Sequence, residues 1–127
     1  MPTSVLVAER NVILLDAMVA QLSMAGYVVH KAQSGLECLG KLRESWPDAA
    51  VIDHQLPWGG GDGVAAWLQE EAFSPVAVVM LVDGSLDLEP GDTNRLWLRK
   101  PFHGKTLISA VEAAVRSTRR RPAGVGF

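Results

Sequence analysis

The chain has 127 residues, 48% of them hydrophobic and 20% charged, so it is long enough for one domain that buries its own core. A net charge of −2 gives no general attraction to nucleic acid. The longest uninterrupted apolar run, residues 76–82, is far shorter than the roughly 20 residues of a membrane helix, and no basic and apolar leader opens the chain. We therefore expect no membrane segment and no export signal, and the single cysteine, Cys38, favours a reducing compartment such as the cytoplasm.

The first 31 residues predict two strands separated by one helix. Ser4 to Ala8 is short, apolar and rich in β-branched residues, which is typical of a strand buried on both faces in a parallel sheet. Apolar residues then recur at helical spacing from Val12 to Ala25, and Gly26 is a typical helix stop. Tyr27 to Lys31 predicts the second strand.

The next segment predicts a helix followed by a third buried strand. Ser34 and Glu37 are spaced as in a capping box, so a helix is expected from about Gly35 to Glu44. Ala49 to Ile52 is wholly apolar and predicts a strand that places Asp53 at its carboxyl end.

The following third of the chain is rich in loop signals. Leu56 to Gly63 contains three consecutive glycines, and Asp62 is expected to cap a helix. Val76 to Leu81 predicts a fourth buried strand, and Leu96 to Leu98 predicts a short fifth strand. Between them, Asp83 to Asn94 contains glycine, proline and four acids without a helical stripe, so we expect mostly loop.

Strands and helices alternate along the whole chain, which ends in a helix whose buried stripe runs from Leu107 to Val115. Such alternation predicts right-handed crossovers and a parallel sheet covered on both faces, with ligand chemistry beyond the carboxyl ends of the strands. Glu9, Asp53, Val82 and Lys100 all follow predicted strands at that edge.

Four short motifs in this order resemble the response-regulator receiver family, over Val5 to about Thr118. They are VLVAER at the first strand, VIDHQLP around Asp53, the pair Asp62 and Gly63, and the run Lys100, Pro101 and Phe102. Each motif alone is weak, because an aspartate that ends an apolar strand is common. Their joint order and spacing on five alternating strands make the resemblance specific.

The resemblance implies an α/β fold: a doubly wound, flavodoxin-like, five-stranded parallel sheet in the order 2-1-3-4-5. Residues 1–118 are expected to form the receiver-like domain and residues 119–127 a basic, linker-like tail. The arginines near that tail are interpreted as a solvated helix end, with no direct nucleic-acid binding by this domain. The spacing from Val82 to Lys100, which includes Pro90 and Gly91, is short for the family, so its fourth helix should be shortened or lost.

The resemblance also implies a phosphorylation site. In the family, an aspartate in the position of Asp53 attacks a phosphoryl group, and Mg²⁺ neutralises the oxygens that would otherwise repel it. Here Glu9, Asp53 and the backbone carbonyl of Gln55 match the metal ligands, and Lys100 matches the ammonium that contacts the phosphoryl group. The plain alternatives are a capping carboxylate at Asp53 and a surface lysine at Lys100.

Two positions depart from the family pattern. Arg10 replaces the second acidic residue after the first strand, and its guanidinium stays charged at any relevant pH. If Arg10 points into the site, an ion pair with Asp53 at ~4 Å would give a gross attraction of roughly 4 kcal/mol before desolvation is deducted. Val82 lacks the switch hydroxyl of the family, and Trp97 matches its switch aromatic. We therefore expect Mg²⁺ binding to be weak or absent.

The resulting prediction is a receiver-type signalling module of a two-component phosphorelay, atypical, not an enzyme, and acting by protein binding with weak or absent phosphorylation. The alternative is an active receiver phosphorylated on Asp53 by a histidine kinase with Mg²⁺. Expected partners are a histidine kinase or phosphotransfer protein and an output protein or domain, and a homodimer stays open. An enzyme of flavodoxin-like architecture is a third alternative, but no flavin or dinucleotide fingerprint supports it.

Overall fold

The computed structural model describes residues 2–58, 60–70, 76–84 and 96–119. They form one five-stranded parallel sheet in the order β2-β1-β3-β4-β5, which confirms the predicted topology. The strands are β1 Ser4–Ala8, β2 Val28–Ala32, β3 Ala49–Asp53, β4 Ala77–Asp83 and β5 Leu96–Lys100. The helices are α1 Val12–Met24, α2 Gly35–Ser45, α3 Gly61–Glu70 and α4 Gly104–Arg119.

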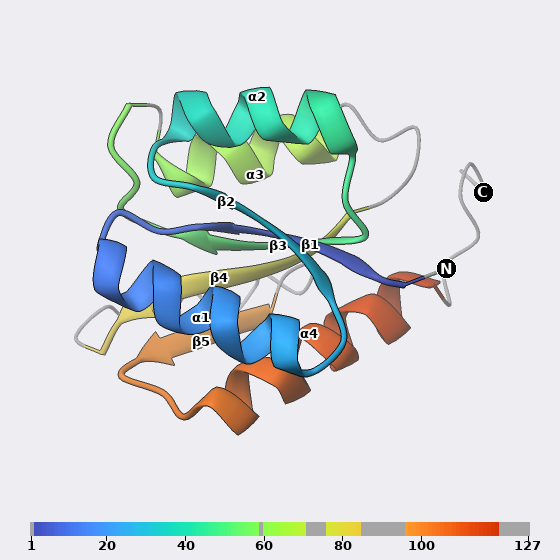
Figure 1. The fold of residues 1–127 in the computed structure, drawn as a ribbon. Helices are drawn as coiled ribbons and strands as arrows, with labels where there is room; N and C mark the ends of the chain where they lie inside the picture. The colour runs from blue at the N-terminus through green and yellow to red at the C-terminus, as the bar shows by residue number, and fades with distance from the viewer. Residues whose placement is uncertain (1, 59, 71–75, 85–95, 120–127) are drawn as a thin grey trace.

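The helices cover both faces of the sheet (Figure 1). Helices α2 and α3 lie on one face, and α1 and α4 lie side by side on the other. Each face has its own apolar core: Cys38, Leu42 and Leu68 pack with one set of strand residues, and Leu15 and Leu107 pack with the other. All five residues of β3 are buried, as expected for a central strand covered on both sides.

Helix α1 begins and ends where its local sequence requires. Asn11 precedes it, and the Asn11 side chain accepts hydrogen bonds from two free N–H groups of the first turn. Gly26 follows it with a φ of +100°, a conformation that most residues with a Cβ adopt only with strain. The N–H of Gly26 donates to the carbonyl of Ser23, and the chain turns there into β2.

Helix α2 begins at the predicted cap. Oγ of Ser34 accepts a hydrogen bond of 3.1 Å from the N–H of Glu37, so the expected Ser34 cap is confirmed. The helix runs one residue beyond the predicted Glu44, to Ser45. Trp46 ends it in the left-handed region, at a φ of 41°.

The expectation that Asp62 caps α3 is wrong, because the helix begins at Gly61 and places Asp62 inside its first turn. The reason is a close approach between Gly61 and the end of β3. The N–H of Gly61 donates to the carbonyl of His54, and a Cβ on Gly61 would lie 2.2 Å from the carbonyl oxygen of Asp53. Glycine therefore lets the helix start directly against the strand.

Several strand boundaries also differ from the sequence prediction. Strand β2 lies one residue later than predicted, and β4 and β5 continue to Asp83 and Lys100, which pair with each other. Backbone pairing thus extends beyond the apolar residues that marked these strands. The segment expected to lack a full fourth helix falls largely on residues 85–95, and most of the expected tail falls on 120–127; both lie outside the described residues.

In the described ranges, no helix combines the length and apolar character needed to cross a membrane.

Candidate functional site

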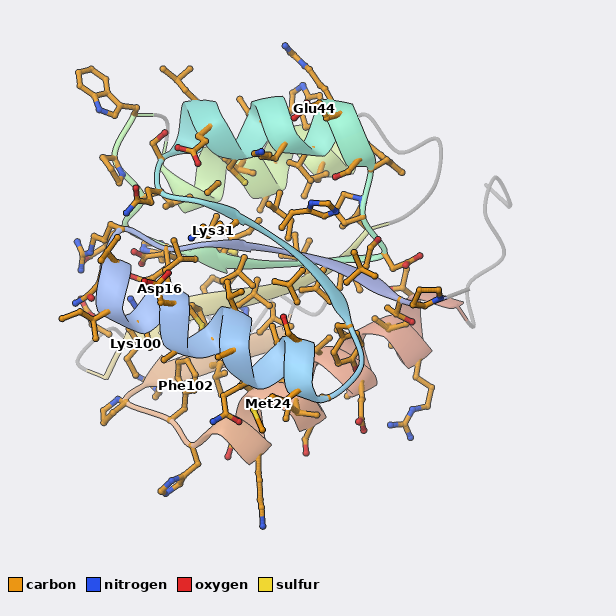
Figure 2. All side chains as sticks on the ribbon, in the orientation of Figure 1. Asp16, Met24, Lys31, Glu44, Lys100 and Phe102 are labelled. Carbon is orange, nitrogen blue, oxygen red and sulfur yellow. The ribbon has the colours of Figure 1, made fainter. Side chains whose placement is uncertain are left out.

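Four strands bring charged residues to one edge of the sheet. Glu9 and Arg10 directly follow β1, Asp53 ends β3, Asp83 ends β4 and Lys100 ends β5. Because all strands are parallel, these ends gather at the left of Figure 1, and Figure 2 shows Lys100 near the start of α1. The predicted residues Glu9, Asp53 and Lys100 therefore form one cluster.

Both oxygens of Asp53 face donors. Oδ1 accepts a hydrogen bond of 3.1 Å from the N–H of Gln55 and lies 3.4 Å from Nζ of Lys100. Oδ2 accepts a long hydrogen bond of 3.4 Å from the N–H of Arg10 and lies 3.5 Å from Nε of the same residue. The Asp53 side chain is only 2% exposed, so these donors replace most of its contact with water.

Glu9 is fully buried and is held by its own pair of donors. Its Oε1 lies 2.6 Å from Nζ of Lys100, and its Oε2 accepts a hydrogen bond of 2.9 Å from the N–H of Asn11. A buried carboxylate is unfavourable unless it is paired, so Lys100 compensates Glu9 more closely than it compensates Asp53.

Arg10 bridges two carboxylates, whereas the sequence anticipated only one. One terminal nitrogen of its guanidinium lies 3.9 Å from Oδ2 of Asp83, and the side chains of Arg10 and Asp83 are 44% and 45% exposed. Solvent therefore weakens this second contact, whose role is mainly to orient the guanidinium. With Glu9, Asp53 and Asp83 against Arg10 and Lys100, the cluster carries one net negative charge.

Sequence reasoning missed Asp83, which it assigned to a loop. The available signal was its place directly after Val82, at the carboxyl end of a buried strand beside β3. That position lies at the same edge of the sheet as Asp53, because β3 and β4 are parallel. The charge reversal at Arg10 is thus accompanied by a carboxylate at the end of β4, the strand that pairs with β3.

Val82 and Trp97 lie on the same face of the sheet, as diagonal neighbours on β4 and β5. Val82 is 1% exposed and supplies only methyl groups there. The Trp97 ring lies 6.3 Å from the ring of His54, between centroids, and its buried Nε1 has no hydrogen-bond partner among the described residues. These two neighbouring positions therefore provide an aromatic side chain, that of Trp97, but no hydroxyl group, because valine has none.

The loop after β3 displays Trp58 to solvent. Trp58 is 75% exposed and has a φ of 58°, which is rare for a bulky residue. The carbonyl of Pro57 accepts a hydrogen bond of 2.8 Å from the N–H of Gly35, so the loop is anchored to the start of α2.

A family model described as the response regulator receiver domain matches residues 5–90. The chain belongs to the response-regulator receiver family. The transcriptional regulatory protein CseB of Streptomyces coelicolor is 32% identical over 120 residues, which cover 90% of this chain and 50% of that protein. The phosphate regulon transcriptional regulatory protein PhoB of Escherichia coli is 28% identical over 123 residues, which cover 91% and 53%.

Solved receiver structures share the fold. The chemotaxis response regulator CheY4 of Vibrio cholerae superposes with a TM-score of 0.81 at 22% identity, covering 90% of this chain and 99% of that chain. The signal receiver domain of an HD domain-containing protein from Pseudomonas fluorescens gives 0.82 at 21% identity, covering 95% and 100%.

The chain is thus a receiver domain of the two-component response-regulator type, and receiver domains are signalling modules rather than classical enzymes. It spans about half the length of the curated relatives it matches.

Receiver domains generally bind Mg²⁺ at the phosphorylation site, and the residues of this receiver fit that ion poorly. All four carboxylate oxygens of Glu9 and Asp53 already face nitrogen donors. Within the described part of the chain, no three histidine, cysteine, aspartate or glutamate side chains are grouped so that they could hold a metal ion. A divalent cation would have to displace Arg10 or Lys100 from their carboxylates.

Proposed function

We propose that this receiver signals by binding a protein partner, and that Asp53 accepts a phosphoryl group slowly or not at all. The observation that carries the proposal is the contact of 3.5 Å between Nε of Arg10 and Oδ2 of Asp53. A cation that belongs to the protein thus contacts the carboxylate that, in an active receiver, must bind a divalent metal ion.

The physical argument rests on charge. Phosphoryl transfer to a carboxylate brings several negative oxygens together, and it requires a cation that contacts both partners. Arg10 contacts Asp53 from the side of β1, and the carboxylate of Asp83 holds the Arg10 guanidinium in this place. Any Mg²⁺ near Glu9 and Asp53 would be repelled by this guanidinium as well as by Lys100.

An active phosphoacceptor is the second candidate, and one observation favours it. Lys100 lies 3.4 Å from Oδ1 of Asp53, so an ammonium is placed where a transferring phosphoryl group would need it. Arg10 is 44% exposed and not locked in the core, so an incoming phosphodonor can displace it at a moderate cost.

The family suggests two kinds of partner for either candidate. One is a histidine kinase or phosphotransfer protein that meets the edge around Asp53, and the other is an output protein or domain. Under the first candidate, output depends on the amount of partner and not on phosphorylation.

The test is intact-mass measurement after incubation with acetyl phosphate and Mg²⁺. We expect little or no gain of one phosphoryl mass under conditions that label an active receiver run in parallel. An Asp53→Asn variant gives the background. Stoichiometric labelling of the wild type that disappears in Asp53→Asn would establish the second candidate and overturn the first.

A further inference from the structure

The end of β4 is held from both sides. On the side of β5, Nη1 of Arg99 donates a hydrogen bond of 3.0 Å to the carbonyl of Gly84, which directly follows β4. Gly84 lies against the backbone of β5, since a Cβ added to it would lie 3.2 Å from the carbonyl oxygen of Lys100. On the other side, Asp83 faces the guanidinium of Arg10. Because β3 lies between β1 and β4 in the sheet (Figure 1), the Arg10 side chain reaches across the end of β3 to the end of β4.

The guanidinium of Arg10 uses different nitrogens for its two carboxylates. Its Nε lies 3.5 Å from Oδ2 of Asp53, and its Nη2 lies 3.9 Å from Oδ2 of Asp83. A guanidinium is planar and rigid, so a movement that changes one of these distances changes the other as well. The charge of Asp53 therefore influences how closely Arg10 holds Asp83.

The two contacts differ in how strongly water screens them. The Asp53 side chain is 2% exposed, whereas the Asp83 side chain is 45% exposed. Attraction between charges is weaker where solvent surrounds them, so Asp53 fixes the position of the guanidinium more firmly than Asp83 does. The contact with Asp83 is consequently the one that adjusts when the charge of Asp53 changes.

The other cation at Asp53 does not offer the same connection. The ammonium of Lys100 lies 2.6 Å from Oε1 of Glu9 and 3.4 Å from Oδ1 of Asp53, so these contacts join β5 to β1 and β3. The backbone hydrogen bonds between β3 and β4 are present whatever the charge of Asp53. Arg10, by contrast, joins Asp53 to a side chain of β4 by charge.

We propose that Arg10 couples the charge of Asp53 to the end of β4. When Asp53 loses its negative charge, the guanidinium moves toward Asp83, the carboxylate that still attracts it, and the contact at the end of β4 tightens. A group that adds negative charge at Asp53 draws the guanidinium away and loosens the same contact. This coupling needs no hydroxyl on Val82, and it goes beyond the proposed function because it does not depend on whether Asp53 is phosphorylated.

The test follows the backbone amide signal of Gly84 in nitrogen–proton correlation NMR spectra of the full chain. Asp53→Asn removes the charge and keeps an oxygen that can accept the hydrogen bond from the N–H of Arg10. It should shift the Gly84 signal. In an Arg10→Gln background the same substitution should move the signal much less, because no guanidinium joins the two carboxylates. Lys105→Gln is the matched background, because it removes one charge from an exposed position of α4 and should leave the response intact.

Salt gives a check on direction. About 1 M NaCl shortens the screening length to about 3 Å, so it should loosen the exposed contact between Arg10 and Asp83. The salt should therefore move the Gly84 signal in the direction opposite to Asp53→Asn, and less in Arg10→Gln than in the wild type. Circular dichroism checks that each variant keeps its helices. A Gly84 signal that ignores Asp53→Asn, that responds equally with and without Arg10, or that shows the same salt response in both proteins would overturn the proposal.

Discussion

Arg10 contacts Asp53 through two different groups, its backbone N–H and its guanidinium Nε. The backbone contact depends only on the path of the chain after β1, so it is kept when Arg10 is replaced by any residue other than proline, which has no N–H. The guanidinium contact is the one that a side-chain substitution removes. The charge of residue 10 can therefore be changed while the path of the loop is kept.

At this scale we expect Arg10→Asp to raise the affinity for Mg²⁺ at least tenfold. The substitution removes a cation beside Asp53 and adds a carboxylate near Glu9, both of which favour a divalent ion. Isothermal titration with MgCl₂ measures the change.

Arg116→Asp is the matched control, because it alters the net charge by the same amount on an exposed part of α4. Equal gains in both variants would mean that general electrostatics, not the contact with Asp53, governs the affinity.

At the scale of elements, the site depends on how tightly α3 starts against the end of β3. Gly61 is the point of contact, whereas a Cβ added to Gly63, two residues further, would meet no atom within 4 Å. The two glycines of one helix therefore differ in the room for a side chain.

We expect Gly61→Ala to lower the free energy of unfolding by about 2 kcal/mol, because the added methyl group meets backbone atoms that cannot move aside. Gly63→Ala should leave it unchanged or raise it by about 0.5 kcal/mol, because alanine favours the helix. Urea unfolding followed by circular dichroism gives both values. Similar stabilities for the two variants would show that the contact with Asp53 relaxes without cost.

Strands β4 and β5 carry the two positions at which the receiver family switches, Val82 and Trp97. In a receiver, a hydroxyl after the fourth strand responds to the phosphoryl group, and the fifth-strand aromatic side chain follows. Val82 cannot make that bond. Trp97 should therefore keep one orientation when a phosphoryl mimic binds.

Incorporated 5-fluorotryptophan makes this testable by fluorine NMR, with Trp97→Phe to assign the signal. Arg10→Asp with Mg²⁺ and beryllofluoride should leave the Trp97 signal in place, whereas Arg10→Asp combined with Val82→Thr should shift it. A shift in the single Arg10→Asp variant would show that switching does not need the hydroxyl.

At the scale of the whole molecule, Cys38 reports on global stability. It is fully buried between α2 and the sheet, and burial, with a smaller contribution from Glu37, raises the pKa of its thiol from 9.0 to about 12. The folded chain thus keeps the thiol proton at pH values where the unfolded chain releases it. The stability that depends on this proton is complete below pH 9 and is lost as the pH rises toward 12.

We expect the free energy of unfolding to fall by up to about 1.4 kcal/mol from this thiol for each pH unit above 9. Urea unfolding at pH 8, 9 and 10, compared with Cys38→Ala, isolates the effect of the thiol from other titrating groups. The native thiol should also react with a disulfide reagent only as fast as the chain unfolds. Equal pH dependence in both proteins, or rapid labelling of the native state, would contradict the burial of Cys38.

Local sequence signals predict the strands and helices, because burial on both faces of a strand leaves an apolar run, whereas the strand order was implied by the resemblance to the receiver family. The apolar runs at Ser4 to Ala8 and Ala49 to Ile52 match buried strands, and the cap at Ser34 marks the start of α2. The same reasoning placed Asp53 and Lys100 at one edge, since parallel strands end together. The sequence left open whether the Arg10 side chain points into the site and pairs with Asp53.

Which charges pair depends on how the strands and helices pack together. Lys100 makes its shortest contact with Glu9, and Arg10 pairs with Asp83. In both pairs the two residues are far apart in the sequence. Likewise, the start of α3 at Gly61 depends on the carbonyl of Asp53, and not on the local preference of Asp62 for a cap. Periodicity encodes which face of an element is buried, but ion pairs and close backbone contacts depend on distances that only the packed strands and helices define.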